Sequence, residues 1–506
     1  MAVQRMPGGQ VGATTVDVFG HLAKQGAMIE RLASDSRVCA PGVAFFAYPG
    51  EAADGRNFIA DALRRGAAAV VWEAEGFAWD ADWRVPNLGV SGLKREAGAL
   101  AHAFYGRPSE SMWVCGVTGT NGKTSCTQWI AALLAAEGTR AGVIGTLGSG
   151  FPDELSALGN TTPDALELHR VLAELKREGA MAAAMEVSSH GLAQGRVNSV
   201  AFDCALFTNL SHDHLDYHGS MDAYGQAKAM LFDMPGLQSA VLNLDDILGV
   251  QLAQRLATRG QRTIGYALSL SALAPGVVSE FVAAREVSVD DDGMNVSLVS
   301  SWGDAEARIN QLGRFNVSNA LGVLGCLLAY GVAFERAVEL LGALPPVSGR
   351  MQRVTGAGKP LVVVDYAHTP DALEKVLQAL RPVANARGGA LVAVFGAGGD
   401  RDPAKRPLMG EVGSRLADRL LLTSDNPRSE DPDAILAAIC AGVSAGYALE
   451  RDRAAAIARA IGEASAADVV LIAGKGHEAY QEIAGERLPF SDVSAAESAL
   501  ARWSAP

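Results

Sequence analysis

An apolar stretch that runs into a glycine-containing turn constrains the fold of this chain more than any other feature. The stretch covers residues 114–118, the turn is Gly119-Thr120-Asn121-Gly122, and Lys123-Thr124 follow. Apolar residues recur at helical spacing over residues 125–136, so the sequence predicts a buried strand, a turn and a helix in succession. Backbone N–H groups of such a turn bind phosphate at the helix N-terminus, where Lys123 adds a positive charge and Thr124 a hydroxyl suited to Mg2+.

One position departs from the general phosphate-loop pattern, which has glycine where this chain has Val117. The alternative interpretation is an ordinary corner between a strand and a helix. We favour the phosphate loop, because Gly122-Lys123-Thr124 lie at the start of a predicted helix and follow an apolar strand, as the motif requires.

Composition and length are typical of a multidomain enzyme. A chain of 506 residues is too long for one core and suggests about two to four domains. The net charge of -13 disfavours a nucleic-acid partner held by general electrostatic attraction. The six cysteines are scattered without a CxxC pair, which disfavours a zinc ribbon and fits a reducing compartment. Without a signal-peptide core or an apolar run of about 18 residues, we expect a cytoplasmic protein with no membrane partner. We also expect a monomer.

Alternating strand and helix patterns predict an α/β fold, which begins with a small α/β domain at residues 1–106. Two strands and a helix of this domain are expected at residues 43–48, 67–72 and 57–65. Ser34 and Ser36 lie in a polar turn that can present hydroxyls to a sugar or a base. Arg107-Pro108 mark the boundary to the next domain.

The middle domain, residues 107–345, is predicted to contain a mostly parallel sheet around the phosphate loop. Strands and closing helices are expected at residues 141–146, 181–187, 202–208 and 239–244, and at 317–330 and 334–344. Thr162 is predicted to cap a helix that starts at Pro163 and ends at Gly179. Residues 290–293 lie between valine-rich stretches, which indicates an appended β-hairpin.

The third predicted domain, residues 346–506, follows a proline-rich linker at 345–349 and contains a second open α/β sheet. Its strands are expected at residues 361–366, 390–396, 419–424 and 468–473, and its helices at 371–380, 406–417, 434–443 and 454–464. Ligands bind such sheets at the carboxyl ends of the strands. Polar motifs follow three of these strands, at residues 365–368, 398–402 and 424–428.

Candidate metal ligands follow two strands of the middle domain. Glu186 ends one strand and can hold Mg2+ near the phosphate loop. Residues 212–218, after the next strand, contain three histidines and two aspartates. Zinc is disfavoured there because no cysteine or matching distant cluster accompanies them, which leaves Mg2+ or substrate contact. Lys228 lies in a helical pattern, and composition alone predicts a solvated side chain for it.

Two further sets of polar residues suggest substrate binding. The first set follows strands of the middle sheet and can converge on an anionic substrate: Asn160, Thr161, Thr162, Ser188, Gln194 and Arg196. In the C-terminal domain, Arg401 and Arg428 suit bidentate binding of carboxylates, whereas Asp425 and Asn426 can accept hydrogen bonds from an ammonium group. This combination predicts a zwitterion such as an amino acid, and a merely charged loop is the alternative.

The motifs, taken together and in order, resemble those of the Mur ligases, the ATP-dependent amide-forming enzymes of peptidoglycan synthesis. The matching stretches are residues 118–124, 160–163, 186–190, 213–218, 313–316, 365–368 and 474–478. Val117 agrees with this family's own version of the phosphate loop. The resemblance implies an N-terminal UDP-binding domain, a central ATP-binding domain and a C-terminal Rossmann-like domain that receives the amino acid.

The resemblance also implies roles for individual residues. The UDP-sugar would contact Ser34, Ser36, Glu51, Ala52 and Ala53, and its dipeptide Asn160, Thr161, Thr162, Ser188, Gln194 and Arg196. ATP would contact Gly119, Thr120, Asn121, Gly122, Lys123, Thr124, Asn316, Arg350, Asp365 and His368. Thr124, Glu186, His214 and Lys228 would hold Mg2+, with Lys228 carbamylated rather than solvated; Lys123, Lys228 and His214 would be catalytic.

The amino-acid pocket implied by the resemblance comprises Arg401, Asp425, Asn426, Pro427, Arg428, Gly474 and Glu478. In this family Asp-Asn-Pro-Arg accompanies meso-diaminopimelate, whose second carboxylate Arg428 can pair. Lysine lacks that carboxylate and would leave a buried arginine without a partner, at a cost of several kcal/mol.

We therefore expect transfer of the ATP γ-phosphate to the glutamyl carboxylate of UDP-N-acetylmuramoyl-L-alanyl-D-glutamate, followed by attack of the diaminopimelate amine on the acyl phosphate. A lysine-adding muramyl ligase and a folylpolyglutamate-synthetase-like ligase are the enzymatic alternatives. A nucleotide-binding regulatory switch is the alternative from another class of protein.

Overall fold

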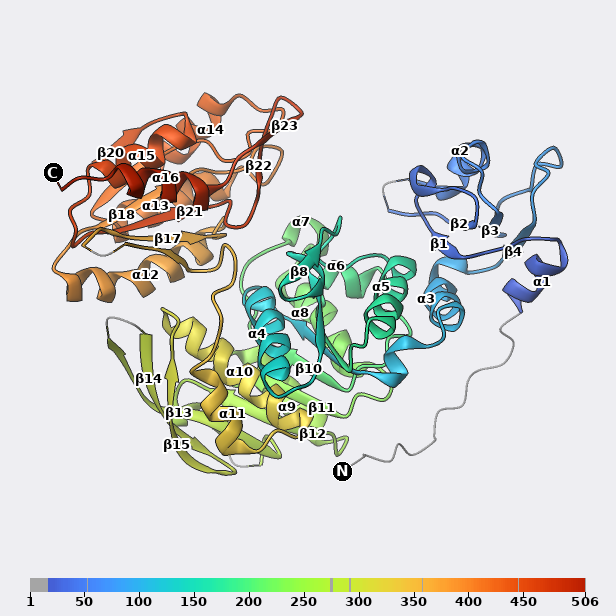
Figure 1. Ribbon diagram of the computed structural model, residues 1–506, viewed down its shortest axis with the longest axis horizontal. Coiled ribbons are helices and arrows are strands. Elements are labelled where there is room, and N and C mark those ends of the chain that lie inside the picture. Colours follow the sequence, from blue (N-terminus) through green and yellow to red (C-terminus); the bar gives the residue numbers. More distant parts are fainter. Residues whose placement is uncertain are drawn as a thin grey trace. The chain divides into compact units, whose positions relative to one another are not determined.

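The computed structural model describes residues 17–51, 53–273, 276–290, 293–356, 358–444 and 446–505 (Figure 1). The chain divides into two compact units. The amino-terminal unit contains Met1–Pro108, Asp164–Glu174 and Gly195–Val200, and the main unit contains the remainder. No helix in the described ranges is long and apolar enough to cross a membrane.

The amino-terminal unit is built on a parallel four-stranded sheet in the order β1-β2-β3-β4. Its strands are β1 (Arg31–Ala33), β2 (Val43–Ala47), β3 (Ala69–Glu73) and β4 (Asn87–Val90). Its helices are α1 (Val18–Lys24), α2 (Ile59–Arg64) and α3 (Leu93–Phe104). The two predicted strands and the helix between them are confirmed, whereas β1 and β4 are too short to give a clear pattern.

The larger sheet of the main unit has eleven strands, in the order β15-β14-β13-β12-β11-β10-β5-β9-β6-β7-β8. Their bounds are β5 (Trp113–Thr118), β6 (Ala141–Gly145), β7 (Gly148–Phe151), β8 (Glu154–Ser156), β9 (Ala182–Glu186), β10 (Cys204–Phe207), β11 (Ser239–Asn243), β12 (Arg262–Ala267), β13 (Glu280–Asp290), β14 (Gly293–Ser300) and β15 (Gly303–Ile309). Neighbouring strands pair in parallel across the central part of the sheet, as predicted. This part has the order β13-β12-β11-β10-β5-β9-β6. The predicted hairpin is confirmed by the antiparallel pairing of β13 with β14, although residues 291 and 292 lie outside the described ranges.

Helices on one face of this sheet form a common apolar core with it. α4 (Lys123–Ala136), α10 (Arg314–Tyr330) and α11 (Phe334–Leu341) contribute to this core together with the central strands. The other helices of this region are α5 (Ala165–Arg177), α6 (Ser189–Ala193), α7 (Leu215–His218), α8 (Met221–Ala229) and α9 (Ile247–Ala257). Both predicted closing helices are confirmed, and the loop helix begins at Lys123 rather than at residue 125.

The predicted cap of α5 is wrong. The helix begins at Ala165, and the Asp164 side chain accepts the backbone N–H groups of Leu166 and Glu167 over 2.9 and 3.2 Å. The Thr162 hydroxyl instead donates to the backbone carbonyl of Glu186 over 2.9 Å. Aspartate is as good a cap as threonine, so the sequence offered two candidates for the cap.

A six-stranded sheet in the order β16-β17-β21-β18-β19-β20 forms the C-terminal part of the main unit. Its strands are β16 (Gln352–Val354), β17 (Leu361–Asp365), β18 (Leu391–Phe395), β19 (Arg419–Leu422), β20 (Tyr447–Leu449) and β21 (Val469–Ala473), and only β16 is antiparallel. Helices α12 (Pro370–Arg387), α13 (Lys405–Leu416) and α14 (Pro432–Cys440) share one apolar core with it, whereas α15 (Arg453–Gly462) and α16 (Asp492–Arg502) share a second. The predicted strands are confirmed, and the separate hairpin β22 (Tyr480–Ile483) and β23 (Glu486–Pro489) was not foreseen.

Candidate functional site

The turn after β5 has the backbone conformation that a phosphate loop needs. Gly119 and Gly122 have φ angles of 146° and 90°, which side chains rarely tolerate. A Cβ on Gly119 would collide with the Thr208 hydroxyl, and one on Gly122 would collide with the Asn319 side chain. Glycine is therefore required at both positions by space as well as by conformation.

The segment after β10 fixes the shape of this loop. Asn209 accepts the backbone N–H of Thr120 on its carbonyl over 2.8 Å and that of Asn121 on its side chain over 3.0 Å. The Thr208 hydroxyl donates to the Asn121 carbonyl over 2.6 Å. Thr208 and Asn209 were not identified from the sequence, because their role depends on the adjacency of β5 and β10.

Lys123 turns its ammonium group back into the loop. Its Nζ donates to the carbonyls of Gly119 and Thr120 over 2.8 and 2.9 Å. Burial is the largest cause of a lowered pKa at Lys123, with a smaller contribution from Arg350. The positive charge thus lies where the backbone of the loop curves around an anion.

A cavity of about 580 Å³ lies against the loop, within the main unit. Of the ten residues expected to contact ATP, only Gly119 is not part of the cavity lining. The nine that line the cavity are Thr120, Asn121, Gly122, Lys123, Thr124, Asn316, Arg350, Asp365 and His368. Glu186, Thr161, Ser188 and His214 line it as well. The structure therefore brings together residues from the loop, from α10 and from the segment around β17.

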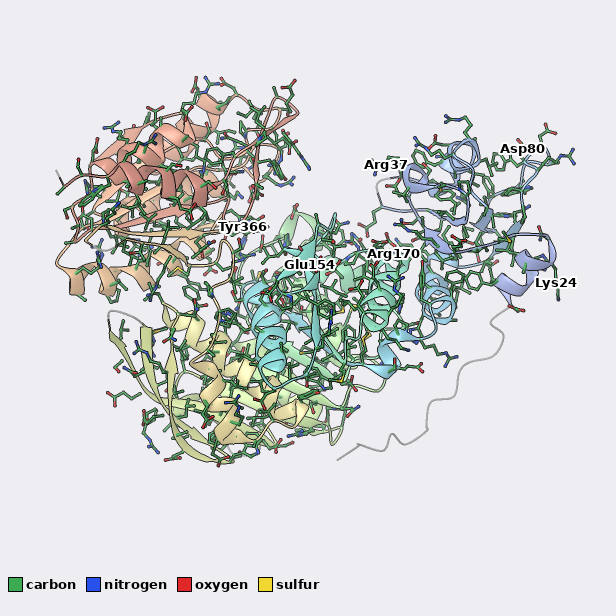
Figure 2. The ribbon with its side chains drawn as sticks, viewed as in Figure 1. Lys24, Arg37, Asp80, Glu154, Arg170 and Tyr366 are labelled. Atoms are coloured by element: carbon green, nitrogen blue, oxygen red, sulfur yellow. The ribbon has the colours of Figure 1, made fainter. Side chains whose placement is uncertain are left out.

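Arg350 and Asp365 connect the C-terminal sheet to this cavity. Arg350 donates to the Thr124 hydroxyl over 3.1 Å, and its guanidinium lies 4.7 Å from the ring centroid of Tyr366, which is labelled in Figure 2. The buried Asp365 carboxylate accepts the backbone N–H groups of Met351 and Ala367, both over 2.8 Å. Burial raises the pKa of Asp365 above its ordinary value. Asp365 thus holds the backbone beside Arg350 in place.

Glu186 and Thr124 offer oxygen ligands to a metal on the cavity wall. Glu186 is buried and accepts the backbone N–H and the hydroxyl of Thr146 over 2.8 and 3.2 Å. In the described part of the chain, no histidine–carboxylate triple has its ligand atoms close enough to share an ion. This arrangement suits Mg2+, which keeps several waters and takes substrate phosphates beside one or two protein oxygens.

The histidine-rich segment packs as a group of rings. His190 lies 4.8 Å from His214 and 4.2 Å from Tyr217, measured between ring centroids. His218 Nε2 lies 3.0 Å from the Ser189 hydroxyl, whereas His212 is exposed. Desolvation lowers the pKa of both His214 and His218, which favours their neutral forms.

Lys228 is fully buried, so the solvated side chain predicted from composition is wrong. Its Nζ lies 4.3 Å from the ring centroid of Tyr224, whose hydroxyl is 3.1 Å from that of Thr120. Burial is the main cause of a pKa well below the ordinary value, and the positive charge of Lys123 lowers it further. Periodicity placed Lys228 on a helix but did not reveal which face that helix α8 buries.

The amino-acid pocket expected in the C-terminal sheet contains a buried polar network. Asn426 donates to Glu478 over 2.8 Å, and Lys475 donates to Asn426 and to Glu478 over 2.9 and 2.8 Å. Asp425 is buried against Gly474, where a Cβ would collide with the carboxylate. Lys475 was not singled out from the sequence, although it lies inside the matching motif at residues 474–478.

Two arginines border one glycine of this pocket. A Cβ on Gly398 would lie 3.0 Å from Arg428 Nη1 and 3.8 Å from Arg401 Cγ. Arg428 donates to the Gly399 carbonyl over 2.6 Å, whereas Arg401 is exposed and donates to the Asp400 carbonyl over 3.1 Å. The structure thus places both predicted carboxylate-binding residues around residues 398–399.

Strand β22 holds the Asp425–Asn426–Pro427–Arg428 loop. Gln481 donates to the Asp425 carbonyl over 2.7 Å, and the Glu482 backbone N–H donates to Asn426 Oδ1 over 2.9 Å. The Arg428 backbone N–H donates to the Glu482 carbonyl over 3.0 Å. The sequence contains no strand pattern strong enough to predict β22.

The residues expected to bind the UDP-sugar and dipeptide fall in both units. In the amino-terminal unit Ser34 donates to Asp164 over 3.2 Å, and Ser36 donates to Asp61 over 2.8 Å. That unit also contains Glu51, Ala53 and Arg196, whereas Ala52 lies outside the described residues. Asn160, Thr161, Thr162, Ser188 and Gln194 belong to the main unit.

Three of these main-unit residues, Thr161, Thr162 and Ser188, lie close together. The Thr162 hydroxyl is bonded to the Ser188 side chain over 3.1 Å, and the Thr161 hydroxyl lies 3.0 Å from that of Thr146. Asn160 is exposed. Gln194 donates to the Tyr217 hydroxyl over 3.4 Å.

The main unit thus has a phosphate loop on a parallel sheet, and Arg350 joins this loop to a second α/β sheet that carries a buried polar network. Three family models match the chain in order. They are the Mur ligase family catalytic domain at 28–105, the Mur ligase middle domain at 117–327 and the Mur ligase glutamate ligase domain at 349–476. The chain belongs to the Mur ligase family.

Individual relatives agree with these matches. UDP-N-acetylmuramoyl-L-alanyl-D-glutamate–2,6-diaminopimelate ligase of Ectopseudomonas mendocina is 52% identical over 485 residues, which covers 96% of this chain and 97% of the relative. A solved structure of a ligase with the same name is 36% identical, with a TM-score of 0.66 and coverage of 94% and 95%. The MurF ligase of Thermotoga maritima, solved in complex with ADP, shares the fold at 18% identity, with a TM-score of 0.63 and coverage of 94% and 97%.

Proposed function

We propose that this protein is an ATP-dependent ligase that joins meso-diaminopimelate to UDP-N-acetylmuramoyl-L-alanyl-D-glutamate in cytoplasmic peptidoglycan precursor synthesis. Curated relatives about 50% identical over nearly the whole chain are named UDP-N-acetylmuramoyl-L-alanyl-D-glutamate–2,6-diaminopimelate ligases. The single observation that carries the proposal is the position of Arg428 and Arg401 around Gly398, beside the Asn426–Glu478–Lys475 network. The Arg428 guanidinium would pair with the second carboxylate of the incoming amino acid.

The phosphate loop and Arg350 bind ATP in this proposal. Backbone N–H groups at the start of α4 and the Lys123 ammonium stabilise the charge of the transferring phosphoryl group. For the phosphate to enter, Lys123 exchanges its bonds with the Gly119 and Thr120 carbonyls for bonds with phosphate oxygens. The glutamyl carboxylate attacks the γ-phosphorus, ADP leaves, and the resulting acyl phosphate is attacked by the diaminopimelate amine with loss of phosphate.

Mg2+ fits the oxygen donors of the cavity wall. Thr124, Glu186 and His214 line the cavity and would hold it. A carbamylated Lys228, which is buried against Tyr224, would complete the set. When bound, the ion neutralises charge on the phosphates. Lys228 suits this modification, because burial favours the neutral amine, the form that adds to CO2.

The remaining site residues have substrate-binding roles. Asn160, Thr161, Thr162, Ser188, Gln194 and Arg196 contact the dipeptide in this proposal, and Ser34, Ser36 and residues 51–53 contact the UDP-sugar. The domains 1–106, 107–345 and 346–506 then bind UDP, ATP and the amino acid. The protein acts as a monomer, without nucleic acid or membrane.

A substrate-dependent ADP-release assay tests the proposal. Purified protein receives ATP, Mg2+ and UDP-N-acetylmuramoyl-L-alanyl-D-glutamate, with meso-diaminopimelate or lysine as the amino acid. We expect ADP release to require all substrates and to favour meso-diaminopimelate strongly. Equal rates with lysine would support the lysine-adding ligase, and ADP release that ignores both substrates would contradict ligation altogether.

A further inference from the structure

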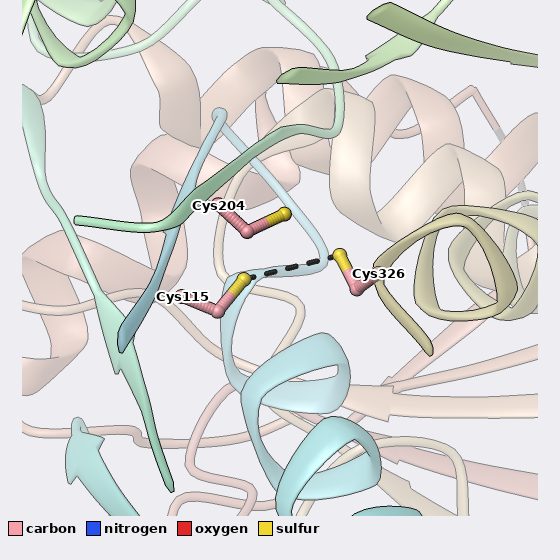
Figure 3. A group of neighbouring side chains, drawn as sticks. All are labelled: Cys115, Cys204 and Cys326. Atoms are coloured by element: carbon pink, nitrogen blue, oxygen red, sulfur yellow. Dashed lines mark hydrogen bonds between the residues drawn. The ribbon is translucent and has the colours of Figure 1, made fainter. Parts of the chain in front are cut away.

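Three cysteine thiols converge in the core beneath the phosphate loop, although they are far apart in the sequence (Figure 3). Cys115 on β5 and Cys204 on β10 are register partners of adjacent parallel strands, and Cys326 lies on α10. The Cys115 and Cys326 sulfurs are 3.8 Å apart, and all three sulfurs lie within 4.8 Å of one another. All three residues are fully buried.

This spacing matches a trigonal sulfur site. A metal–sulfur distance of about 2.3 Å places three sulfurs around one ion roughly 4 Å apart. The thiols therefore need shifts of well under 1 Å to share an ion. No other group of three histidine, cysteine or carboxylate side chains in the described ranges has its ligand atoms this close.

We propose that Cys115, Cys204 and Cys326 form a binding site for a single Cu+ ion. Soft thiolates select Cu+ and Zn2+ among the common metals. Structural zinc takes four ligands, and this group supplies three inside an apolar core, whereas Cu+ accepts three sulfurs without water. Each thiol that coordinates loses its proton to bulk water, and no electron is transferred.

The local environment assists the loss of one proton. Hydrogen bonds from Cys115 and Cys326 lower the pKa of Cys204. Burial raises the pKa of Cys115 and Cys326, so these two thiols ionise only on coordination. Metal uptake at this site is therefore expected to weaken as the pH falls.

The ion would join three elements that shape the phosphate loop. β5 leads into the loop, β10 leads to Thr208 and Asn209, and α10 carries Asn319, which packs against Gly122. An ion that joins these elements stabilises the folded state by mass action. We expect the copper-loaded protein to melt several degrees higher than the metal-free protein.

Copper stoichiometry tests the site in the full-length protein. Wild type and Cys115→Ala, Cys204→Ala and Cys326→Ala variants are purified from cells grown with added copper, or are loaded anaerobically with Cu+ against a chromophoric chelator. Cys126→Ala is the matched control, because Cys126 is equally buried in the same core but outside the group. We expect one Cu+ per chain in wild type and control, and at least tenfold weaker retention in the other three variants.

X-ray absorption of the copper-loaded wild type keeps the proposal testable if a variant fails to fold. Three sulfur ligands around copper support the site, whereas one or two, or nitrogen ligands, would overturn it. Absence of retained copper by both loading routes, or equal retention in all variants, would also overturn it. Zn2+ in excess should leave the copper in place, and displacement by Zn2+ would show that the assigned ion is wrong.

Discussion

Arg350 Nη2 donates a hydrogen bond to Thr124 Oγ1 over 3.1 Å and so joins two residues 226 positions apart in the chain. Thr124 lies in the first turn of α4, and Arg350 lies just before β16 of the six-stranded sheet. The ring of Tyr366, 4.7 Å away, supports the guanidinium from a second side. This pair places a fixed positive charge on the cavity wall, next to the phosphate loop.

Replacing Arg350 by lysine should weaken nucleotide binding. Lysine cannot both reach Thr124 and stack on Tyr366, because its point charge lacks the planar fork of arginine. We expect the Kd for ADP to rise roughly tenfold, about 1.4 kcal/mol, in isothermal titration calorimetry. Arg415→Lys, on the half-exposed side chain of α13, is the control and should bind ADP like wild type. An unchanged Kd in Arg350→Lys would remove Arg350 from the nucleotide site.

Lys123→Ala should strongly reduce turnover while leaving the fold intact. The Lys123 ammonium group donates hydrogen bonds to the Gly119 and Thr120 carbonyls, so removing it should cost little stability. We expect substrate-dependent ADP release to fall by roughly a hundredfold or more, because a charge that stabilises the phosphoryl group is removed. Lys176→Ala, at an exposed position of α5, should retain full activity. Near-normal turnover in Lys123→Ala would refute the assigned phosphate loop.

Activity should depend on dissolved CO2 if Lys228 acts as a carbamate. Burial lowers the pKa of Lys228 well below its ordinary value, so protonation of the amine competes less with carbamylation. We expect ADP release to fall in CO2-free buffer and to recover on addition of bicarbonate. Lys228→Ala should be weakly active and insensitive to bicarbonate. A wild-type rate that bicarbonate does not change would contradict the carbamate.

The Arg428→Ala variant should lose much more activity with meso-diaminopimelate than with lysine. The lost carboxylate contact is expected to lower kcat/KM for meso-diaminopimelate by about a hundredfold, equivalent to about 2.7 kcal/mol. The rate with lysine should change little, since lysine has no second carboxylate to pair. Arg487→Ala, which removes a largely exposed arginine from β23, is the matched control. Parallel losses for both amino acids would mean that Arg428 supports the fold of the pocket rather than its selectivity.

The stability of the fold should fall as the pH is lowered from 6.5 to 4, because His169 is buried in its neutral form. Desolvation lowers the pKa of this buried histidine from 6.5 to about 4, and its Nε2 lies 3.0 Å from the Asn198 carbonyl. Between pH 6.5 and 4 the unfolded chain therefore binds more protons than the folded chain. The free energy of unfolding falls by roughly 3 kcal/mol as the pH is lowered over this range. His169→Gln keeps a hydrogen-bond donor but does not titrate, so its denaturant midpoint should change less over this range. His21→Gln, at an exposed position of α1, should behave like wild type.

The sequence predicted those parts of the fold and site that local patterns encode. The β5–loop–α4 unit could be predicted because glycine spacing, apolar runs and helical periodicity all occur within about twenty residues. The cap of α5 was misassigned because Thr162 and Asp164 are both good caps, and only tertiary contacts draw Thr162 to Glu186. Lys228 was misread from composition because the burial of one helix face depends on distant partners.

Contacts between distant segments account for what could not be predicted. Thr208 and Asn209 shape the loop only because β10 lies beside β5. The short strand β22 carries no alternating pattern, yet its backbone fixes the orientation of Asn426 and Arg428. Short elements of this kind depend on tertiary pairing more than on propensity.

The pairing of β22 with the loop at residues 425–428 also sets an order of events during synthesis. Glu482 bonds Asn426 across a separation of 56 residues, so the loop leaves the ribosome well before the strand that holds it. A nascent chain released up to residue 479 would carry the complete phosphate loop and its surrounding sheet. It would still lack the strand that orients Arg428, so the pocket proposed to select the amino acid would be completed only after the nucleotide site has been made.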